Sequence, residues 1–331
     1  MNVRRLIPAA ALAGAVALGA TALTACSDAG AASGSGSGGL DVTASFYPMQ
    51  FLAERIGKDH VKVSTLTKPG VEPHDLDITP KQTAQLGEAD VVLYLKGLQP
   101  AVDEAVAQSG VKNVVDAATL TELEAHAASG HDGHDHAAEG GAEAEGHGHD
   151  HDHGHDEGGK DPHVWLDPSK YAEIAKGVGA SLEKADPDHA ADYKKNTADL
   201  VAELGALDTE FKDGLKNTAS RTFITTHSAF GYLAEHYGLD QEGIAGVDPE
   251  SEPSPARMKE LQAVARKDNV TTVFFETLAS DKTATTLARD TGLKTDVLDP
   301  LEGISDTSQG DDYFEVMRSN LKNLQKALGA K

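Results

Sequence analysis

The feature that most constrains the fold is a repeated alternation of short β-rich runs with amphipathic segments. The first block has β-rich runs at residues 41–46, 61–66, 90–95 and 111–116. A second block has β-rich runs at 222–225, 270–275 and 294–298. Helices are expected between these runs and after them, at 48–56, 80–89, 230–237, 254–268, 281–291 and 311–328. Strands that alternate with helices form parallel, doubly wound sheets. We therefore predict an α/β protein with two similar lobes built on mainly parallel sheets.

One helical segment, residues 188–217, is much longer than the others. Its apolar residues recur at spacings of three, four and seven, which is typical of one buried helix face: Tyr193, Leu200, Leu204, Leu207, Phe211 and Leu215. A helix of roughly 30 residues spans about 45 Å. We expect it to be a rigid connection between an N-terminal lobe (40–187) and a C-terminal lobe (218–331), with a cleft between them.

The first 25 residues have the pattern of an export signal. Arg4 and Arg5 precede an apolar run, which ends in Leu23-Thr-Ala-Cys26. The last four residues resemble the bacterial lipobox, in which the cysteine carries a lipid after cleavage. We expect Cys26 to anchor the mature chain to the outer face of the cell membrane through a Gly/Ser-rich tether, residues 26–39. The two arginines leave Sec and twin-arginine export both open.

Composition excludes several classes of function. With 29 Lys and Arg against 53 Asp and Glu, the formal charge is −24, which argues against nucleic-acid binding and suits a binder of cations. Cys26 is the single cysteine of the 331 residues, so an internal disulfide and multi-cysteine zinc or iron–sulfur sites are excluded. We expect a monomer.

The segment 126–159 differs from the rest of the chain. It holds nine of the fifteen histidines and nine acidic residues, with no Lys or Arg inside it. So few apolar groups cannot offset the entropy of ordering, and we expect a disordered loop. Beyond His126, the histidines that could capture metal ions weakly are His131, His134, His136, His147, His149, His151, His153 and His155. The alternative is a solvated insertion with no metal role.

Three of the remaining histidines lie at expected turns or strand ends, where open α/β sheets bind ligands: His74, His163 and His227. Asp299 follows the last expected strand in the same way. Three imidazoles and one carboxylate would complete a tetrahedron around Zn²⁺, whereas a second carboxylate would favour manganese. The positions fit no short zinc motif, and a lone loop histidine is more often structural, so spacing alone does not identify a site.

The sequence segments around these residues resemble those of a known family, the metal-binding receptors of bacterial ABC importers. Within that family they resemble the zinc-type (ZnuA- or AdcA-like) lipoproteins. The matching segments are Pro69-Gly-Val-Glu-Pro-His-Asp75, Asp161-Pro-His-Val-Trp-Leu-Asp-Pro168, Thr226-His-Ser-Ala-Phe-Gly-Tyr232, Phe275-Glu-Thr-Leu-Ala-Ser280 and Val297-Leu-Asp-Pro-Leu301. The resemblance implies zinc ligands at His74, His163 and His227, with Asp299 where a carboxylate or water closes the site. It also implies two lobes bridged by a rigid helix.

Some assignments stay open within that resemblance. Glu72 is an alternative fourth ligand. The cysteine pair of some relatives is absent, and manganese-type relatives carry a carboxylate where this chain has His227, which favours zinc. Thr225, Thr226, Asp75 and Asp167 are guesses for groups that orient the imidazoles.

The leading hypothesis is an extracytoplasmic zinc receptor that delivers Zn²⁺ to an ABC permease and performs no catalysis. Within the same fold, the alternatives are a receptor for manganese or another divalent metal, or an adhesin. A secreted zinc hydrolase is the alternative from another class, although the sequence contains no His-Glu-x-x-His.

Overall fold

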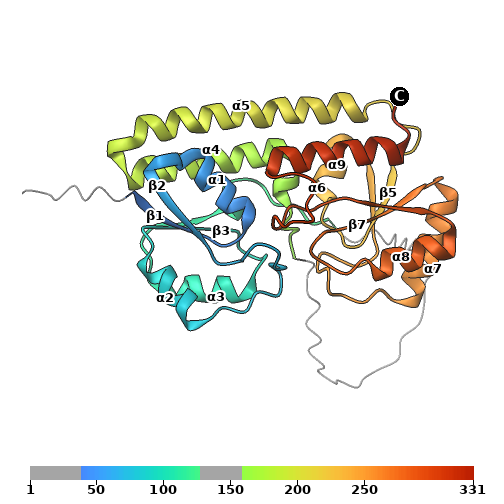
Figure 1. Ribbon diagram of the computed structural model, residues 1–331, viewed down its shortest axis with the longest axis horizontal. Coiled ribbons are helices and arrows are strands. Elements are labelled where there is room, and N and C mark those ends of the chain that lie inside the picture. The colour runs from blue at the N-terminus through green and yellow to red at the C-terminus, as the bar shows by residue number, and fades with distance from the viewer. Residues whose placement is uncertain (1–38, 127–158) are drawn as a thin grey trace, which may run out of the picture. The chain divides into compact units, whose positions relative to one another are not determined.

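The computed structural model describes residues 39–126 and 159–331, which form two α/β lobes joined by a long helix (Figure 1). The first sheet has the strand order β2-β1-β3-β4 and the second has the order β6-β5-β7-β8. Every strand pairing in both sheets is parallel. The predicted fold class, two similar lobes with parallel sheets, is confirmed.

The elements of the first lobe run from residue 40 to residue 185. They are β1 (Leu40–Ala44), α1 (Tyr47–Gly57), η1 (Lys58–His60), β2 (Val61–Thr65), α2 (Pro80–Glu88), β3 (Val91–Tyr94), α3 (Pro100–Ser109), β4 (Val114–Asp116), η2 (Ala117–Thr119), η3 (Val164–Leu166) and α4 (Pro168–Ala185). Thr79 begins α2 with a capping box, in which its hydroxyl accepts from Gln82 N and Pro80 takes the first helical position.

The linking helix and the second lobe follow. Their elements are η4 (Pro187–His189), α5 (Ala190–Leu215), β5 (Thr222–Thr225), α6 (Gly231–Tyr237), β6 (Asp240–Gly243), α7 (Pro255–Lys267), β7 (Thr272–Phe275), α8 (Lys282–Thr291), β8 (Lys294–Val297) and α9 (Tyr313–Leu328). Gly238 and Gly292 end α6 and α8 in the left-handed conformation, as expected of C-terminal glycines.

Both faces of each sheet are covered, so neighbouring strand residues enter different cores. In β3, Val91 and Leu93 join the large central core while Val92 faces a smaller core under α2 and α3. In β7, Phe274 joins the central core and Val273 faces the core under α7 and α8. This explains why β3 and β7 contain continuous apolar runs rather than alternating ones.

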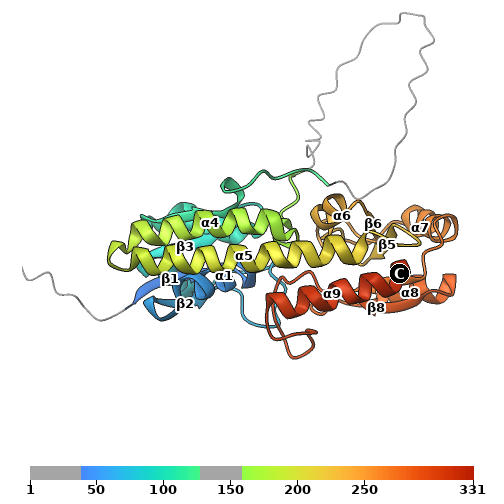
Figure 2. The same ribbon diagram turned by 90° about the horizontal axis from the view of Figure 1, so that it is seen from above.

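Helix α5 runs along both lobes beside α4 and α9 (Figures 1 and 2). The six apolar residues that predicted it are all buried in the central core: Tyr193, Leu200, Leu204, Leu207, Phe211 and Leu215. The helix therefore packs along its length and is continuous with the cores of both lobes. The exact boundaries predicted for the two lobes (40–187 and 218–331) and for the linking helix (188–217) remain predictions.

Several predictions concern residues that the structure does not describe. The export signal, Cys26, the tether up to Gly38 and the histidines from His131 to His155 lie outside the described residues. Within 39–126 and 159–331, no helix combines the length and the hydrophobicity required to span a bilayer.

Candidate metal centre

The three histidines expected as ligands converge where the two lobes meet. His74 lies in the loop after β2, His163 immediately precedes η3, and His227 follows β5. The ring centroids are 5.3 Å apart for His74 and His163, 5.3 Å for His163 and His227, and 6.2 Å for His74 and His227. Residues 153 positions apart in sequence, from His74 to His227, thus share one site.

The fourth member of the group is Glu302, in the segment between β8 and α9. Its Oε1 lies 3.2 Å from His74 Nε2, 3.1 Å from His163 Nε2 and 3.4 Å from His227 Nε2. His74 Nε2 and His163 Nε2 are 3.3 Å apart. The ligand atoms of all four residues lie within 4.8 Å of one another.

These separations match the edges of a zinc tetrahedron. Zinc–nitrogen and zinc–oxygen bonds of about 2.0 to 2.1 Å give ligand–ligand distances of about 3.3 to 3.4 Å in a regular tetrahedron. Four of the six edges, between 3.1 and 3.4 Å, are thus already close to the required length. Three imidazole nitrogens and one carboxylate oxygen form a donor set that suits Zn²⁺.

Two buried carboxylates hold the imidazoles in the required orientation. Asp161 Oδ1 lies 2.7 Å from His163 Nδ1 and accepts from the His163 backbone N–H, and Glu276 Oε1 lies 2.8 Å from His227 Nδ1. Because an ionised carboxylate only accepts hydrogen bonds, each Nδ1 donates and each Nε2 is left for a metal ion. Thr226 donates its hydroxyl hydrogen to Glu276 Oε1 at 2.6 Å and so fixes that carboxylate.

The centre is almost completely enclosed by protein. The side chains of His163 and Glu302 are 0% exposed, that of His227 2% and that of His74 11%. Within the described residues, His227 Nε2 and Glu302 Oε2 are buried without a hydrogen-bond partner. Unpaired polar atoms are costly in a buried site, and a cation held by the four ligand atoms would satisfy His227 Nε2.

The charges of the site depend on one another. Burial disfavours the Glu302 carboxylate, but the neighbouring imidazoles of His163, His227 and His74 outweigh it and hold the pKa of Glu302 well below its usual range. Burial likewise opposes a charged His227, yet Glu276 and Glu302 raise its pKa well above the ordinary value.

Asp299, the expected fourth ligand, lies outside this group. Its Oδ1 accepts from Leu301 N at 2.8 Å, and its Oδ2 accepts from the Thr277 hydroxyl at 3.0 Å. The turn that Asp299 stabilises puts Leu301 in the left-handed region (φ 57°) and brings Glu302, rather than Asp299, to the histidines. Sequence analysis missed Glu302 because we chose the carboxylate nearest the strand end.

The other expected neighbours also have different tasks. Glu72 Oε1 accepts from His74 N, while burial and the negative Glu302 raise the pKa of Glu72 to about 9. Asp75 is exposed. Asp167 caps α4 by accepting from Ser169 N. Asp161 and Glu276, which the sequence analysis did not single out, hydrogen-bond the imidazoles of His163 and His227, and the local sequence signal for Asp161 is its position two residues before His163.

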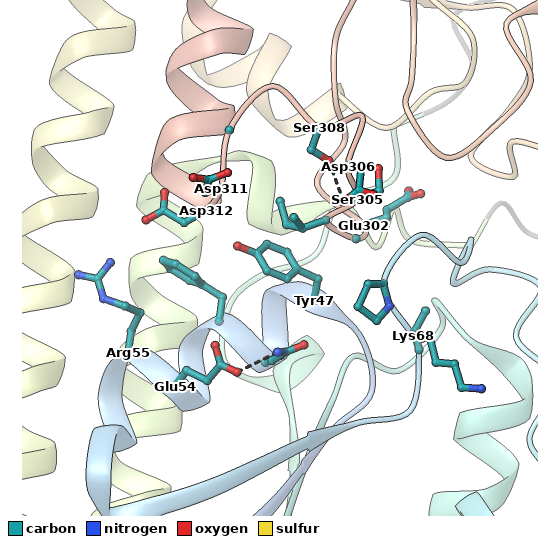
Figure 3. Close-up of a pocket in the computed structure, with 17 residues that line it drawn as sticks. Tyr47, Glu54, Arg55, Lys68, Glu302, Ser305, Asp306, Ser308, Asp311 and Asp312 are labelled. Carbon is teal, nitrogen blue, oxygen red and sulfur yellow. Dashed lines mark hydrogen bonds between the residues drawn. The ribbon is translucent and has the colours of Figure 1, made fainter.

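A groove of about 770 Å³ reaches the segment that carries Glu302 (Figure 3). Figure 3 shows Tyr47 and Arg55 of α1 on one side, and Asp311 and Asp312, just before α9, on the other. Glu302 and Gly303 contribute to its lining. The groove thus separates parts of the two lobes next to the metal centre.

Comparison with known proteins agrees with this geometry. The family model "Zinc-uptake complex component A periplasmic" (ZnuA) matches residues 42–327, nearly all of the described chain. The chain belongs to the ZnuA family. Among sequence relatives, this ZnuA-family chain is 37% identical over 295 residues to the "High-affinity zinc uptake system protein ZnuA" of Bacillus subtilis, covering 87% of this chain and 88% of that protein.

A second relative is the "Zinc-binding lipoprotein AdcA" of Streptococcus pneumoniae, 35% identical over 310 residues. The alignment covers 92% of our ZnuA-family chain but 58% of AdcA, so AdcA is considerably longer than the shared part. The Zn(II)-bound ZnuA-like domain of that protein superposes with a TM-score of 0.69 at 30% identity, covering 88% of this chain and 99% of that domain.

Another similar structure is the laminin-binding protein Lmb of Streptococcus agalactiae, described as bifunctional with adhesin and metal transporting activity. It has a TM-score of 0.73 and 30% identity, and the match covers 88% of this chain and 100% of Lmb. Within the ZnuA family, the two-lobed architecture is therefore shared by proteins named for zinc uptake and for adhesion.

Proposed function

We propose that this protein is an extracytoplasmic zinc receptor, which binds one Zn²⁺ at His74, His163, His227 and Glu302 and delivers it to an ABC permease. The observation that carries the proposal is the convergence of three imidazole Nε2 atoms and Glu302 Oε1, with four of their six separations near the edge length of a zinc tetrahedron. The relatives named for zinc uptake support the choice of ion and the transport role.

The donor set favours zinc over manganese. Mn²⁺ prefers carboxylate and water oxygens in octahedral geometry, whereas three imidazoles and a single carboxylate oxygen suit a tetrahedral ion. A hydrolytic zinc site would use three protein ligands and keep one position for water. Four protein donors that complete a tetrahedron support binding and release rather than hydrolysis.

Two further parts of the proposal rest on sequence. Cleavage before Cys26 and its lipidation would tether the receptor to the outer face of the membrane, next to the permease. The histidines from His131 to His155 would capture zinc weakly nearby. The lipoprotein name of AdcA supports the first part.

Isothermal titration tests the receptor. We would use the full chain with the eight histidines between 131 and 155 changed to asparagine, so that they contribute no heat. The expected result is one tight zinc site per chain, lost in His227→Gln, and much weaker binding of Mn²⁺. If no tight zinc site is found, or if manganese binds as tightly as zinc, the proposal is wrong.

A further inference from the structure

A second group of metal-binding side chains lies where the described chain leads into the histidine-rich segment. The ligand atoms of Glu124, His126 and Glu235 lie within 4.8 Å of one another. Glu124 and His126 end the first described range, and Glu235 belongs to α6. We propose that these residues form an outer site for a Zn²⁺-like dication, weaker than the main centre and coupled to it through Asp161.

The proposal extends the proposed function, on which its biological meaning rests, but its geometry stands alone. His126, which we expected to begin a disordered loop, has a side chain only 15% exposed. His126 Nδ1 lies 2.8 Å from Asp161 Oδ2, while Asp161 Oδ1 holds His163 Nδ1 at 2.7 Å. One fully buried carboxylate thus holds two imidazoles, one from each group.

The arrangement around Asp161 is the same on both sides. Because the carboxylate only accepts, His126 and His163 both donate from Nδ1, and each directs Nε2 toward another carboxylate. His126 Nε2 lies 3.0 Å from Glu235 Oε2, as His163 Nε2 lies 3.1 Å from Glu302 Oε1. Such a contact is favourable when a proton or a cation lies between the two atoms, and a dication held by both would take the place of the proton.

The surroundings provide room for the imidazole and access for an ion. A pocket of about 540 Å³ is lined by His126 and Glu235. Gly231, at the start of α6, makes space for the ring, because a Cβ atom there would lie 2.5 Å from His126 Cγ. A larger residue at position 231 would therefore displace the imidazole from Asp161 and from Glu235.

Two features make the outer site weaker than the main centre. The side chains of Glu235 and Glu124 are 63% and 39% exposed, so binding must order them. Lys170 Nζ lies 2.8 Å from Glu124 Oε1 and competes with an ion for that carboxylate. One nitrogen and two oxygens leave further positions to water, unlike the four protein donors of the main centre.

The shared carboxylate determines the sign of the coupling. A dication on His126 Nε2 makes the Nδ1 hydrogen a stronger donor to Asp161, which then accepts less well from His163. A filled outer site should therefore weaken zinc binding at the main centre, and by linkage a filled main centre weakens the outer one. An effect of about fivefold in affinity is in the usual range.

The test uses the full chain with the eight histidines from 131 to 155 changed to asparagine, titrated with Zn²⁺. We expect one tight and one weak site. His126→Gln, Glu235→Gln and Gly231→Ala should each weaken the second site at least tenfold and keep the first. Lys170→Gln should strengthen the second site. Asp240→Asn, which changes a carboxylate in the same pocket but outside the group, is the matched control and should change neither.

The outcomes separate this inference from the proposed function. A chain that binds one zinc tightly and no second ion, or whose second site is unchanged by both His126→Gln and Glu235→Gln, overturns the outer site only. Glu235 is mostly exposed, so Glu235→Gln should fold even if Gly231→Ala does not. The chain with intact His227 could also show no tight site and one weak site that persists in His227→Gln. That result overturns the proposed function but supports the outer site.

Discussion

Asp299 and Glu302 show how two carboxylates three residues apart acquire different tasks. The Asp299 side chain stabilises the backbone turn, since it accepts a hydrogen bond from Leu301 N. The Asp299 backbone N–H donates to Asn320 Oδ1. Glu302, placed by that turn, faces three imidazoles. Both are buried, so burial alone does not distinguish a ligand from a residue that builds the turn.

Their substitution should give different results. Glu302→Gln removes the charged oxygen from the centre, and we expect zinc affinity to fall by at least about 100-fold, beyond the typical loss of an orienting partner. Asp299→Asn keeps an oxygen that can accept from Leu301 N, so affinity should fall less than about tenfold. Competition with a chromogenic chelator measures both. A greater loss in Asp299→Asn would assign the ligand role to Asp299.

His236 provides a pH-dependent contribution to stability away from the metal centre. Its Nδ1 lies 2.9 Å from Asp167 and its Nε2 lies 2.9 Å from Asp208. The hydrogen bond to Asp167 raises the pKa of His236 above 6.5, although burial opposes this. The stabilisation is therefore complete below the unfolded pKa of 6.5 and is lost as pH rises through the higher folded pKa.

We expect His236→Gln to lower the free energy of unfolding by about 1.5 to 3 kcal/mol at pH 6, the typical value of a hydrogen bond to a charged group. The difference from the unmodified chain should shrink toward pH 8.5. Urea unfolding in the presence of a chelator measures it, and the metal-site histidines cancel because both chains contain them. A difference that is constant or grows with pH would contradict this explanation.

At the scale of single residues, the sequence predicts the three clustered histidines well and the carboxylates that contact them poorly. His74, His163 and His227 stand next to strand ends within short motifs, which local reading can find. Asp161 stands only two residues before His163, whereas Glu276 and Glu302 reach the site through turns and through the contact between the lobes, which no local pattern encodes. Glu276 lies 49 residues from the histidine that it orients.

At the scale of elements, prediction succeeded where one side of the segment is buried. The α5 pattern is reliable because each of its apolar residues packs in the core. The strand β6, Asp240–Gly243, has the sequence DQEG and lies at the sheet edge, so it lacks the apolar signal used for the other strands. We also did not identify α4, where short alanine and glycine residues weaken the periodic pattern.

Two glycines in the long helices should respond oppositely to alanine. Gly205 lies inside α5, and no neighbouring atom of the described residues comes within 4 Å of the place that a Cβ would take there. Gly205→Ala should therefore raise the free energy of unfolding by about 0.5 to 1 kcal/mol.

Gly179 of α4 faces Thr197 of α5, whose Cγ2 and Cβ would lie 2.9 and 3.0 Å from a new Cβ. Gly179→Ala should destabilise by about 1 to 3 kcal/mol. Chemical denaturation measures both, and equal effects would mean that α4 and α5 do not pack this closely.

For the whole molecule, the two lobes contribute equally to the proposed metal centre. His74 and His163 come from the first lobe, and His227 and Glu302 come from the second. Direct hydrogen bonds between the lobes support it, because Trp165 donates to Pro300 O at 2.8 Å and Tyr313 donates to Trp165 O at 2.7 Å. A bound ion therefore adds a cross-link between the lobes.

Zinc should accordingly stabilise the folded chain as a unit. At a free concentration 100 times the dissociation constant, binding adds about 2.7 kcal/mol to the free energy of unfolding. Calorimetry with zinc and with a chelator should show a higher unfolding temperature with zinc, and His227→Gln should abolish the increase. Stabilisation that survives in His227→Gln would mean that the ion binds mainly elsewhere.

The equal division of ligands has a mechanical consequence. Metal–ligand bonds tolerate deviations of only about 0.2 Å, so a slight rotation of one lobe would pull two donors off the ion together. If the proposed permease contacts both lobes, a small rotation of one lobe relative to the other would be enough to release the ion, and each lobe would stay internally intact.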